Sequence, residues 1–173
     1  DPVGRLMQAP YVAIAWRSCG EGADQLAGIS SGLAAAGWST AIERRGLALW
    51  RRAERPAPIV DHGDAIIVGR RFLGADAGPG AGAAGSSAAR IVDRARALCR
   101  EGWGAYVALL HNPCGDDWWA FRDPSGAVEA FTWVTGNLRV VCSGLDHVPT
   151  SLLPGRLCLD WLAIADFLNR HAS

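Results

Sequence analysis

Hydrophobic and polar positions along the chain fall into blocks with the period of strands and blocks with the period of helices. Apolar residues at three- and four-residue steps predict a helix over Gly22–Ala36, another that starts near Ser86 or Ser87, and a C-terminal one over Leu157–Arg170. Apolar runs of strand length, bounded by turn-forming residues, predict strands at Ala9–Trp16, Trp38–Glu43, Leu47–Arg52, Ala65–Gly69, Gly104–Leu109, Trp118–Arg122, Ala127–Val134 and Leu138–Cys142.

The helix that follows the glycine- and alanine-rich segment Gly74–Ser87 is expected to be amphipathic. The segment itself has no hydrophobic period and is expected to be a loop, with Ser86 or Ser87 capping the helix. The face expected to be buried contains Ile91, Val92, Ala95, Leu98 and Cys99, and the face expected to be in solvent contains Arg90, Asp93, Arg94, Arg96 and Arg100.

The aromatic strand near the middle of the chain predicts burial on both of its sides. Trp118 and Phe121 are three residues apart, so they point to opposite faces of an extended strand. The Asp-Pro-Ser-Gly sequence that follows predicts a β-turn, because Pro fixes φ and Gly accepts a positive φ. A strand returning over Ala127–Val134 would make this a hairpin. Arg122 and Asp123 are read as pinning the turn through a salt bridge or backbone hydrogen bonds, with ligand binding as the alternative.

The order of the elements favours an α+β fold. Strands and helices come in blocks and do not alternate regularly, which suits two antiparallel sheets packed face to face with helices outside. The chain contains 8 tryptophans, and we expect most of them to fill the space between layers.

Length, charge and cysteine usage narrow the classes of function. The 173 residues carry a formal net charge of +0, which argues against nucleic acid or an anionic membrane as the main partner. No apolar run approaches the roughly 20 residues of a bilayer span, and no signal peptide is recognisable, so a cytoplasmic protein is expected. The cysteines lack metal-binding spacing and are expected to be small core residues in a reducing compartment: Cys19, Cys99, Cys114, Cys142 and Cys158.

Three segments together carry a resemblance to a known family. Gly104–Leu109, the turn after Trp118–Phe121, and Val140–Ser143 resemble the N-terminal glutaminase-type domain of asparagine synthetases. The turn consists of Arg122, Asp123, Pro124, Ser125 and Gly126. The resemblance implies a four-layer αββα sandwich of two mostly antiparallel sheets, of the Ntn-hydrolase or glutamine amidotransferase type.

The residues that such a domain uses for chemistry are not matched. In the family, a cysteine before the first strand attacks glutamine, and no cysteine precedes Tyr11 here. An asparagine–glycine pair stabilises the oxyanion in the family, and Gly69 keeps only the glycine of that position. The sequence therefore predicts a degenerate domain with no catalytic residues of its own, in which glutamine is not hydrolysed.

Relatives without the cysteine include β-lactam synthetases and the lasso peptide macrolactam synthetases (cyclases), and the second group is the closer in appearance. The resemblance implies a synthetase domain in cis that uses ATP and magnesium, while this segment itself needs no cofactor. On this interpretation residues 1–8 are a tag or flexible N-terminus, 9–156 the degenerate domain, and 157–173 a helix leading into a synthetase domain that is not part of this sequence.

Two alternatives stay open at this point. One is a free-standing interaction module of the same fold that binds a precursor peptide or a partner biosynthetic enzyme. The other is a hydrolase that uses Cys114 with His111, although the surrounding His-Asn-Pro-Cys-Gly-Asp-Asp sequence is more typical of an exposed hairpin loop.

Overall fold

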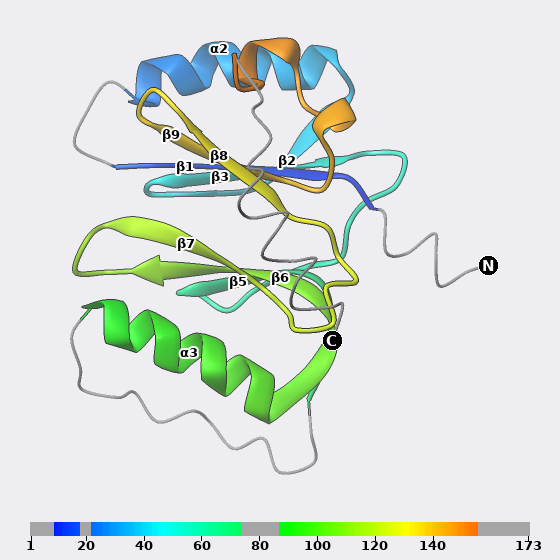
Figure 1. Ribbon diagram of the computed structural model, residues 1–173. Coiled ribbons are helices and arrows are strands. Elements are labelled where there is room, and N and C mark those ends of the chain that lie inside the picture. The colour runs from blue at the N-terminus through cyan, green and yellow to red at the C-terminus, as the bar shows by residue number, and fades with distance from the viewer. Residues whose placement is uncertain (1–8, 18–21, 74–86, 156–173) are drawn as a thin grey trace, which may run out of the picture.

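The computed structural model describes residues 9–17, 22–73 and 87–155. Within these ranges the chain forms a stack of helix, sheet, sheet and helix, as Figure 1 shows. The α+β class and the pair of antiparallel sheets that the sequence predicts are thereby confirmed.

One sheet, here called sheet A, has five strands in the order β2-β3-β1-β9-β8, and every neighbouring pair is antiparallel. Its central strand is buried on both faces along Tyr11–Ala15, which explains why that strand reads as a continuous apolar run. The bounds of its strands are β1 Tyr11–Trp16, β2 Trp38–Arg44, β3 Leu47–Arg52, β8 Phe131–Thr135 and β9 Leu138–Cys142.

The other sheet, here called sheet B, has four strands in the order β4-β5-β6-β7, again antiparallel throughout. Helix α2 (Gly22–Ala35) covers the outer face of sheet A, and helix α3 (Ser87–Glu101) covers that of sheet B (Figure 1). The strands of sheet B are β4 Ile59–Asp61, β5 Ala65–Leu73, β6 Gly102–Asn112 and β7 Asp117–Arg122. Two short 3-10 helices follow β9, at Leu145–His147 and Thr150–Leu152.

Three apolar clusters hold the layers together. One cluster is formed by the side chains that the two sheets direct at each other. Each of the other two lies between a sheet and the helix that covers it. Alternation along a strand sends neighbouring residues to opposite clusters. Trp118 accordingly faces the other sheet, and Phe121 packs in the cluster beneath α3, as the spacing of these two residues predicts.

The chain does not form a hairpin after the aromatic strand, so that part of the prediction is wrong. The second part of the predicted strand Ala127–Val134 is present as β8, which starts at Phe131, but it pairs with β9 in sheet A and not with the aromatic strand, because residues 123–130 cross from sheet B to sheet A. Side chains make hydrogen bonds to several backbone groups of the crossing segment. The Arg122 guanidinium binds the carbonyl of Val128 at 2.8 Å, and Val128 inserts between the sheets.

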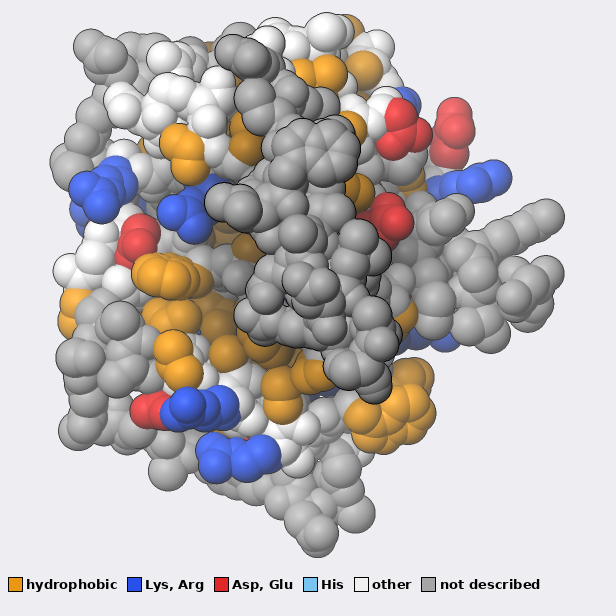
Figure 2. All heavy atoms as spheres, in the orientation of Figure 1, with side chains coloured by type: hydrophobic (Ala, Val, Ile, Leu, Met, Phe, Trp, Pro, Cys, Tyr) orange, Lys and Arg blue, Asp and Glu red, His pale blue; other side chains and the backbone are white. Residues whose placement is uncertain are grey.

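Several element boundaries and faces also differ from the sequence prediction. In α3 the buried side is narrower than expected: Ile91 is buried and Ala95 and Leu98 partly so, whereas Val92 is 47% exposed and Cys99 is exposed as well. Strand β4 was not predicted, and β5 continues beyond Gly69 to Leu73. Among the tryptophans, Trp38, Trp50 and Trp118 are buried, while Trp103 and Trp119 are 69% and 42% exposed. Figure 2 shows apolar side chains at the surface beside scattered basic and acidic ones.

Some predictions fall on residues outside the described ranges. They are the N-terminal segment 1–8, nearly all of the Gly74–Ser87 loop, the helix cap at Ser86, and the C-terminal helix over Leu157–Arg170. Cys19 and Cys158 are outside these ranges too.

Candidate functional site

The family resemblance puts the reactive residue just before β1, and Tyr11 is the first residue of that strand. Its side chain is 0% exposed. Its backbone N–H donates to Ser143 Oγ at 3.1 Å, and its phenol donates to the carbonyl of Glu129 at 3.0 Å. Burial raises the pKa of the Tyr11 phenol well above its ordinary value, so the hydroxyl stays protonated and serves as a donor.

Asp123 lies at the same end of the sandwich and is 4% exposed. Its carboxylate accepts a hydrogen bond from the N–H of Tyr106 at 3.0 Å and one from the N–H of Ser125 at 2.8 Å. The Ser125 hydroxyl also donates to it. These donors satisfy the buried carboxylate within the fold, so its oxygen atoms face the chain's own turn and backbone.

The predicted β-turn is present. The N–H of Gly126 donates to the carbonyl of Asp123 at 3.0 Å, and Gly126 has φ +63°, a conformation that glycine adopts without strain. The Arg122 guanidinium binds the carbonyls of Gly126 and Val128. Arg122 and Asp123 therefore both hold the turn through backbone hydrogen bonds.

Gly69 is required by the close pairing of β5 with β6. It has φ +111°, and a Cβ at this position would lie 2.3 Å from the carbonyl oxygen of Ala105. Its N–H donates to the carbonyl of Pro58 at 2.8 Å, so this donor is already used within the fold. In this structure Gly69 contributes to strand packing.

The described thiols fall into two groups. Cys142 is 0% exposed, its Sγ lies 3.4 Å from the carbonyl of Gly144, and burial raises its pKa to about 11. A thiol with this pKa is protonated at neutral pH and is a poor nucleophile. Cys99 and Cys114 are exposed, so the expectation that the cysteines are core residues is wrong for these two. Cys99 lies in α3 and Cys114 in the turn between β6 and β7, and both are exposed to solvent.

The pair His111 and Cys114 lies at the β6–β7 hairpin, as the loop interpretation predicts. The His111 ring packs on Trp118 with 4.8 Å between ring centroids, and its Nε2 lies 3.7 Å from a carboxylate oxygen of Asp116. The imidazole is thus directed at Trp118 and Asp116. The backbone N–H of Cys114 donates to Asn112 Oδ1 at 3.3 Å.

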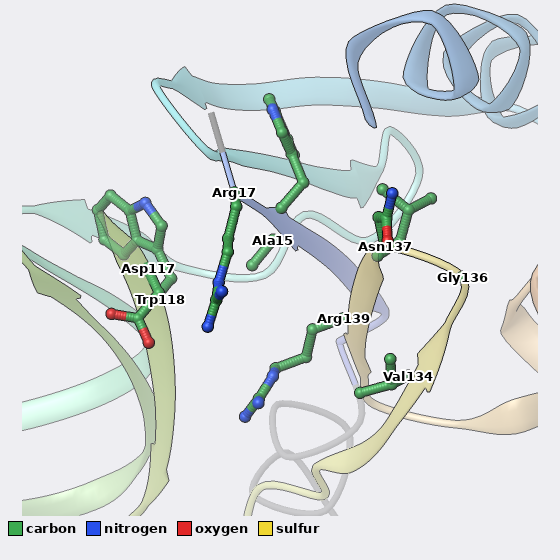
Figure 3. Close-up of a pocket in the computed structure, with 10 residues that line it drawn as sticks. Ala15, Arg17, Asp117, Trp118, Val134, Gly136, Asn137 and Arg139 are labelled. Carbon is green, nitrogen blue, oxygen red and sulfur yellow. The ribbon is translucent and has the colours of Figure 1, made fainter. Parts of the chain in front are cut away.

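A pocket of about 360 Å³ opens at the opposite end of the sandwich, where β1 ends and β7 begins (Figure 3). Arg17 and Arg139 line it, and sequence reasoning missed both. The available signal was the alternation Tyr11, Ala13, Ala15, Arg17, in which a charged residue follows an inward-facing row. The complete lining is Ala15, Trp16, Arg17, Asp117, Trp118, Val134, Gly136, Asn137, Leu138 and Arg139.

Comparison with protein-family models, curated proteins and solved structures finds no match to this chain. In the described ranges, no three or more His, Cys, Asp or Glu side chains gather in a way that could hold a metal ion. None of the helices within these ranges has the length and apolar character needed to cross a bilayer.

Proposed function

We propose that this chain is the non-catalytic glutaminase-like domain of an asparagine synthetase-related, ATP-dependent amide-forming enzyme, with a lasso peptide cyclase as the specific candidate. The observation that carries the proposal is the turn Arg122–Gly126. It holds a buried carboxylate and leads the chain from one sheet to the other in a helix–sheet–sheet–helix stack. This layering is the one that the family resemblance implies for an Ntn-type domain.

The chemistry at the start of β1 supports a domain without glutaminase activity. In the family a terminal cysteine lies before this strand, and here the strand opens with a buried tyrosine bonded to Ser143 and Glu129. Gly69, at the position of the family's oxyanion glycine, gives its N–H to Pro58. The nearby thiol of Cys142 is protonated at neutral pH because burial raises its pKa to about 11.

On this proposal the domain supports a synthetase domain in cis and helps to form the surface that receives a peptide substrate in the cytoplasm. ATP and magnesium would be bound by the synthetase domain and not by the residues of this chain.

A glutaminase assay combined with a reading of the gene tests the proposal. The purified chain should release no ammonia from glutamine, and the glutamine analogue 6-diazo-5-oxo-norleucine should label no residue in intact-mass spectra. Codons downstream of Ser173 should encode a Ser-Gly-Gly-x-Asp-Ser pyrophosphate-binding loop. Ammonia release that disappears on replacing one of the cysteines by alanine would contradict the loss of activity.

The second candidate is a free-standing interaction module of the same fold that binds a precursor peptide or a partner enzyme. The observation that favours it is the arginine-lined pocket, which lies away from the turn Arg122–Gly126. A stop codon shortly after Ser173, together with no synthetase gene nearby, would select this candidate over the first.

A further inference from the structure

Two arginines extend the inward-facing row of sheet A beyond its apolar part. Tyr11, Ala13 and Ala15 of β1 all belong to the cluster between the sheets, so the next inward position along the chain is that of Arg17. Arg139 of β9 pairs directly with Ala15 and therefore projects from the same face. Figure 3 shows both side chains extending into the pocket between the two sheets.

Neither arginine has a counter-ion within the described part of the chain. No described carboxylate lies within ion-pair distance of Arg17 or Arg139. Some surface arginines have such a partner, as Arg94 does with Asp64 at 2.5 Å, and others, such as Arg55, have none in the described ranges. Both side chains are exposed where this row reaches the end of the sandwich. Two neighbouring guanidinium groups repel each other unless an anion lies between them, and an uncompensated conflict of this kind is typical of a functional position.

The opposite wall of the pocket carries one negative charge. Asp117, at the start of β7, accepts hydrogen bonds from Asn112 Nδ2 at 2.7 Å and from Trp119 Nε1 at 2.9 Å. An ionised carboxylate has about four acceptor sites, so Asp117 can accept a further N–H from a ligand. Its charge also disfavours a dianion such as phosphate.

The rest of the lining is largely apolar, and the pocket is large enough for a small ligand. Among the lining residues Trp118 and Leu138 are buried, and Val134 is 64% exposed. A volume of about 360 Å³ falls in the usual range for small-molecule sites, about 300–1,000 Å³.

We propose that this pocket binds a carboxylate that has an N–H group close to it, either in a small acid or in the acidic side chain of a peptide. The carboxylate lies between Arg17 and Arg139, with charge-assisted hydrogen bonds to both, and the N–H faces Asp117. The site does not depend on the family resemblance, because it lies at the end of the sandwich opposite to Tyr11 and Asp123.

The test is a titration followed by ¹H–¹⁵N spectra of the full chain, read at the Trp118 indole and the Asn137 side-chain amide. The probes are N-acetylglycine, the capped peptide acetyl-Ala-Glu-Ala-amide, its neutral counterpart acetyl-Ala-Gln-Ala-amide, and inorganic phosphate. We expect saturable shifts with at least one of the two carboxylate probes. Tighter binding of N-acetylglycine would identify a small acid as the ligand, and tighter binding of the glutamate peptide would identify a peptide side chain. The neutral peptide should cause no shift, and phosphate should bind more weakly.

The double variant Arg17→Gln/Arg139→Gln should weaken binding about tenfold or more, because it removes both charge-assisted hydrogen bonds to the carboxylate. The single variant Arg139→Gln serves if the double variant does not fold. Arg55→Gln is the matched control, because this arginine is exposed in the loop between β3 and β4, away from the pocket, and should leave binding unchanged. No saturable shift with either carboxylate probe, tighter binding of phosphate, or full affinity in the double variant would overturn the proposal.

Discussion

The backbone of Tyr106 exchanges two hydrogen bonds with Asp123. Its N–H donates to the Asp123 carboxylate at 3.0 Å, and its carbonyl accepts from the N–H of Asp123 at 3.1 Å. The side chain of Asp123 thus replaces a backbone carbonyl just beyond the last pair of the β6–β7 ladder, at Val107 and Arg122. The two hydrogen bonds extend the β6–β7 pairing by one step, at the point where the chain leaves sheet B.

We expect the substitution Asp123→Ala to destabilise the protein by roughly 1–3 kcal/mol, because it leaves the N–H groups of Tyr106 and Ser125 without their acceptor. Chemical denaturation measures the loss. Asp93→Ala is the control: it removes an exposed ion pair with Arg96 and should change stability by less than about 1 kcal/mol. Equal effects of the two substitutions would show that the turn does not depend on the Asp123 carboxylate.

The contrast between the turn and its continuation shows what could be predicted from sequence. The turn over Asp123–Gly126 was predictable, because Asp, Pro and Gly each have a local preference that the structure uses. The destination of the chain was not, because it depends on contacts distant in sequence. The phenol of Tyr11 holds the carbonyl of Glu129, 118 residues away, and Val128 inserts between the sheets.

The same limit applies to the arginine pocket. Alternation along β1 places Arg17 on the inward face, but only the pairing of β1 with β9 shows that Arg139 shares that face. No local pattern in the sequence fixes this pairing, since the two strands are more than a hundred residues apart. The sequence alone therefore could not predict that Arg17 and Arg139 line the same pocket.

The bond between Tyr11 and Glu129 gives a second prediction. Tyr11→Phe removes the phenol that donates to the Glu129 carbonyl at 3.0 Å, and we expect a loss of about 1 kcal/mol in the free energy of unfolding. Hydrogen exchange of residues 128–130 should become faster in this variant than in the parent, while exchange in α3 should change little. Unchanged exchange at 128–130 would show that another contact holds the crossing segment.

Two glycines, one in a crowded strand and one in an open helix position, give a third prediction. Gly69→Ala should destabilise the protein by on the order of 2 kcal/mol or more, because φ is +111° there and the added Cβ would meet the Ala105 carbonyl at 2.3 Å. Gly28→Ala, in α2, should stabilise it by about 0.5–1 kcal/mol, since nothing lies within 4 Å of the added methyl group and alanine favours helix. Thermal unfolding of both variants measures the difference, and a Gly69→Ala variant as stable as the parent would contradict the close approach of β5 and β6.

The buried thiol of Cys142 makes stability depend on alkaline pH. Its ordinary pKa of 9.0 rises to about 11 on folding, because burial penalises the thiolate. The folded state therefore holds the proton more tightly than the unfolded state. The stabilisation is complete below about pH 9 and is lost as the pH rises from about 9 to about 11.

Denaturation curves at several pH values test this effect. The free energy of unfolding should fall more steeply between pH 9 and 11 in the parent than in Cys142→Ala, which lacks the titrating group. Burial raises the pKa of Tyr11 in both proteins, and the charge of the Cys142 thiolate raises it further in the parent alone, so the difference between their slopes reports the thiol together with its effect on Tyr11. At about pH 8, iodoacetamide should modify the exposed Cys99 and Cys114 and leave Cys142 intact in peptide mass spectra. Parallel pH profiles, or rapid modification of Cys142 in the folded protein, would show that this thiol is accessible to solvent.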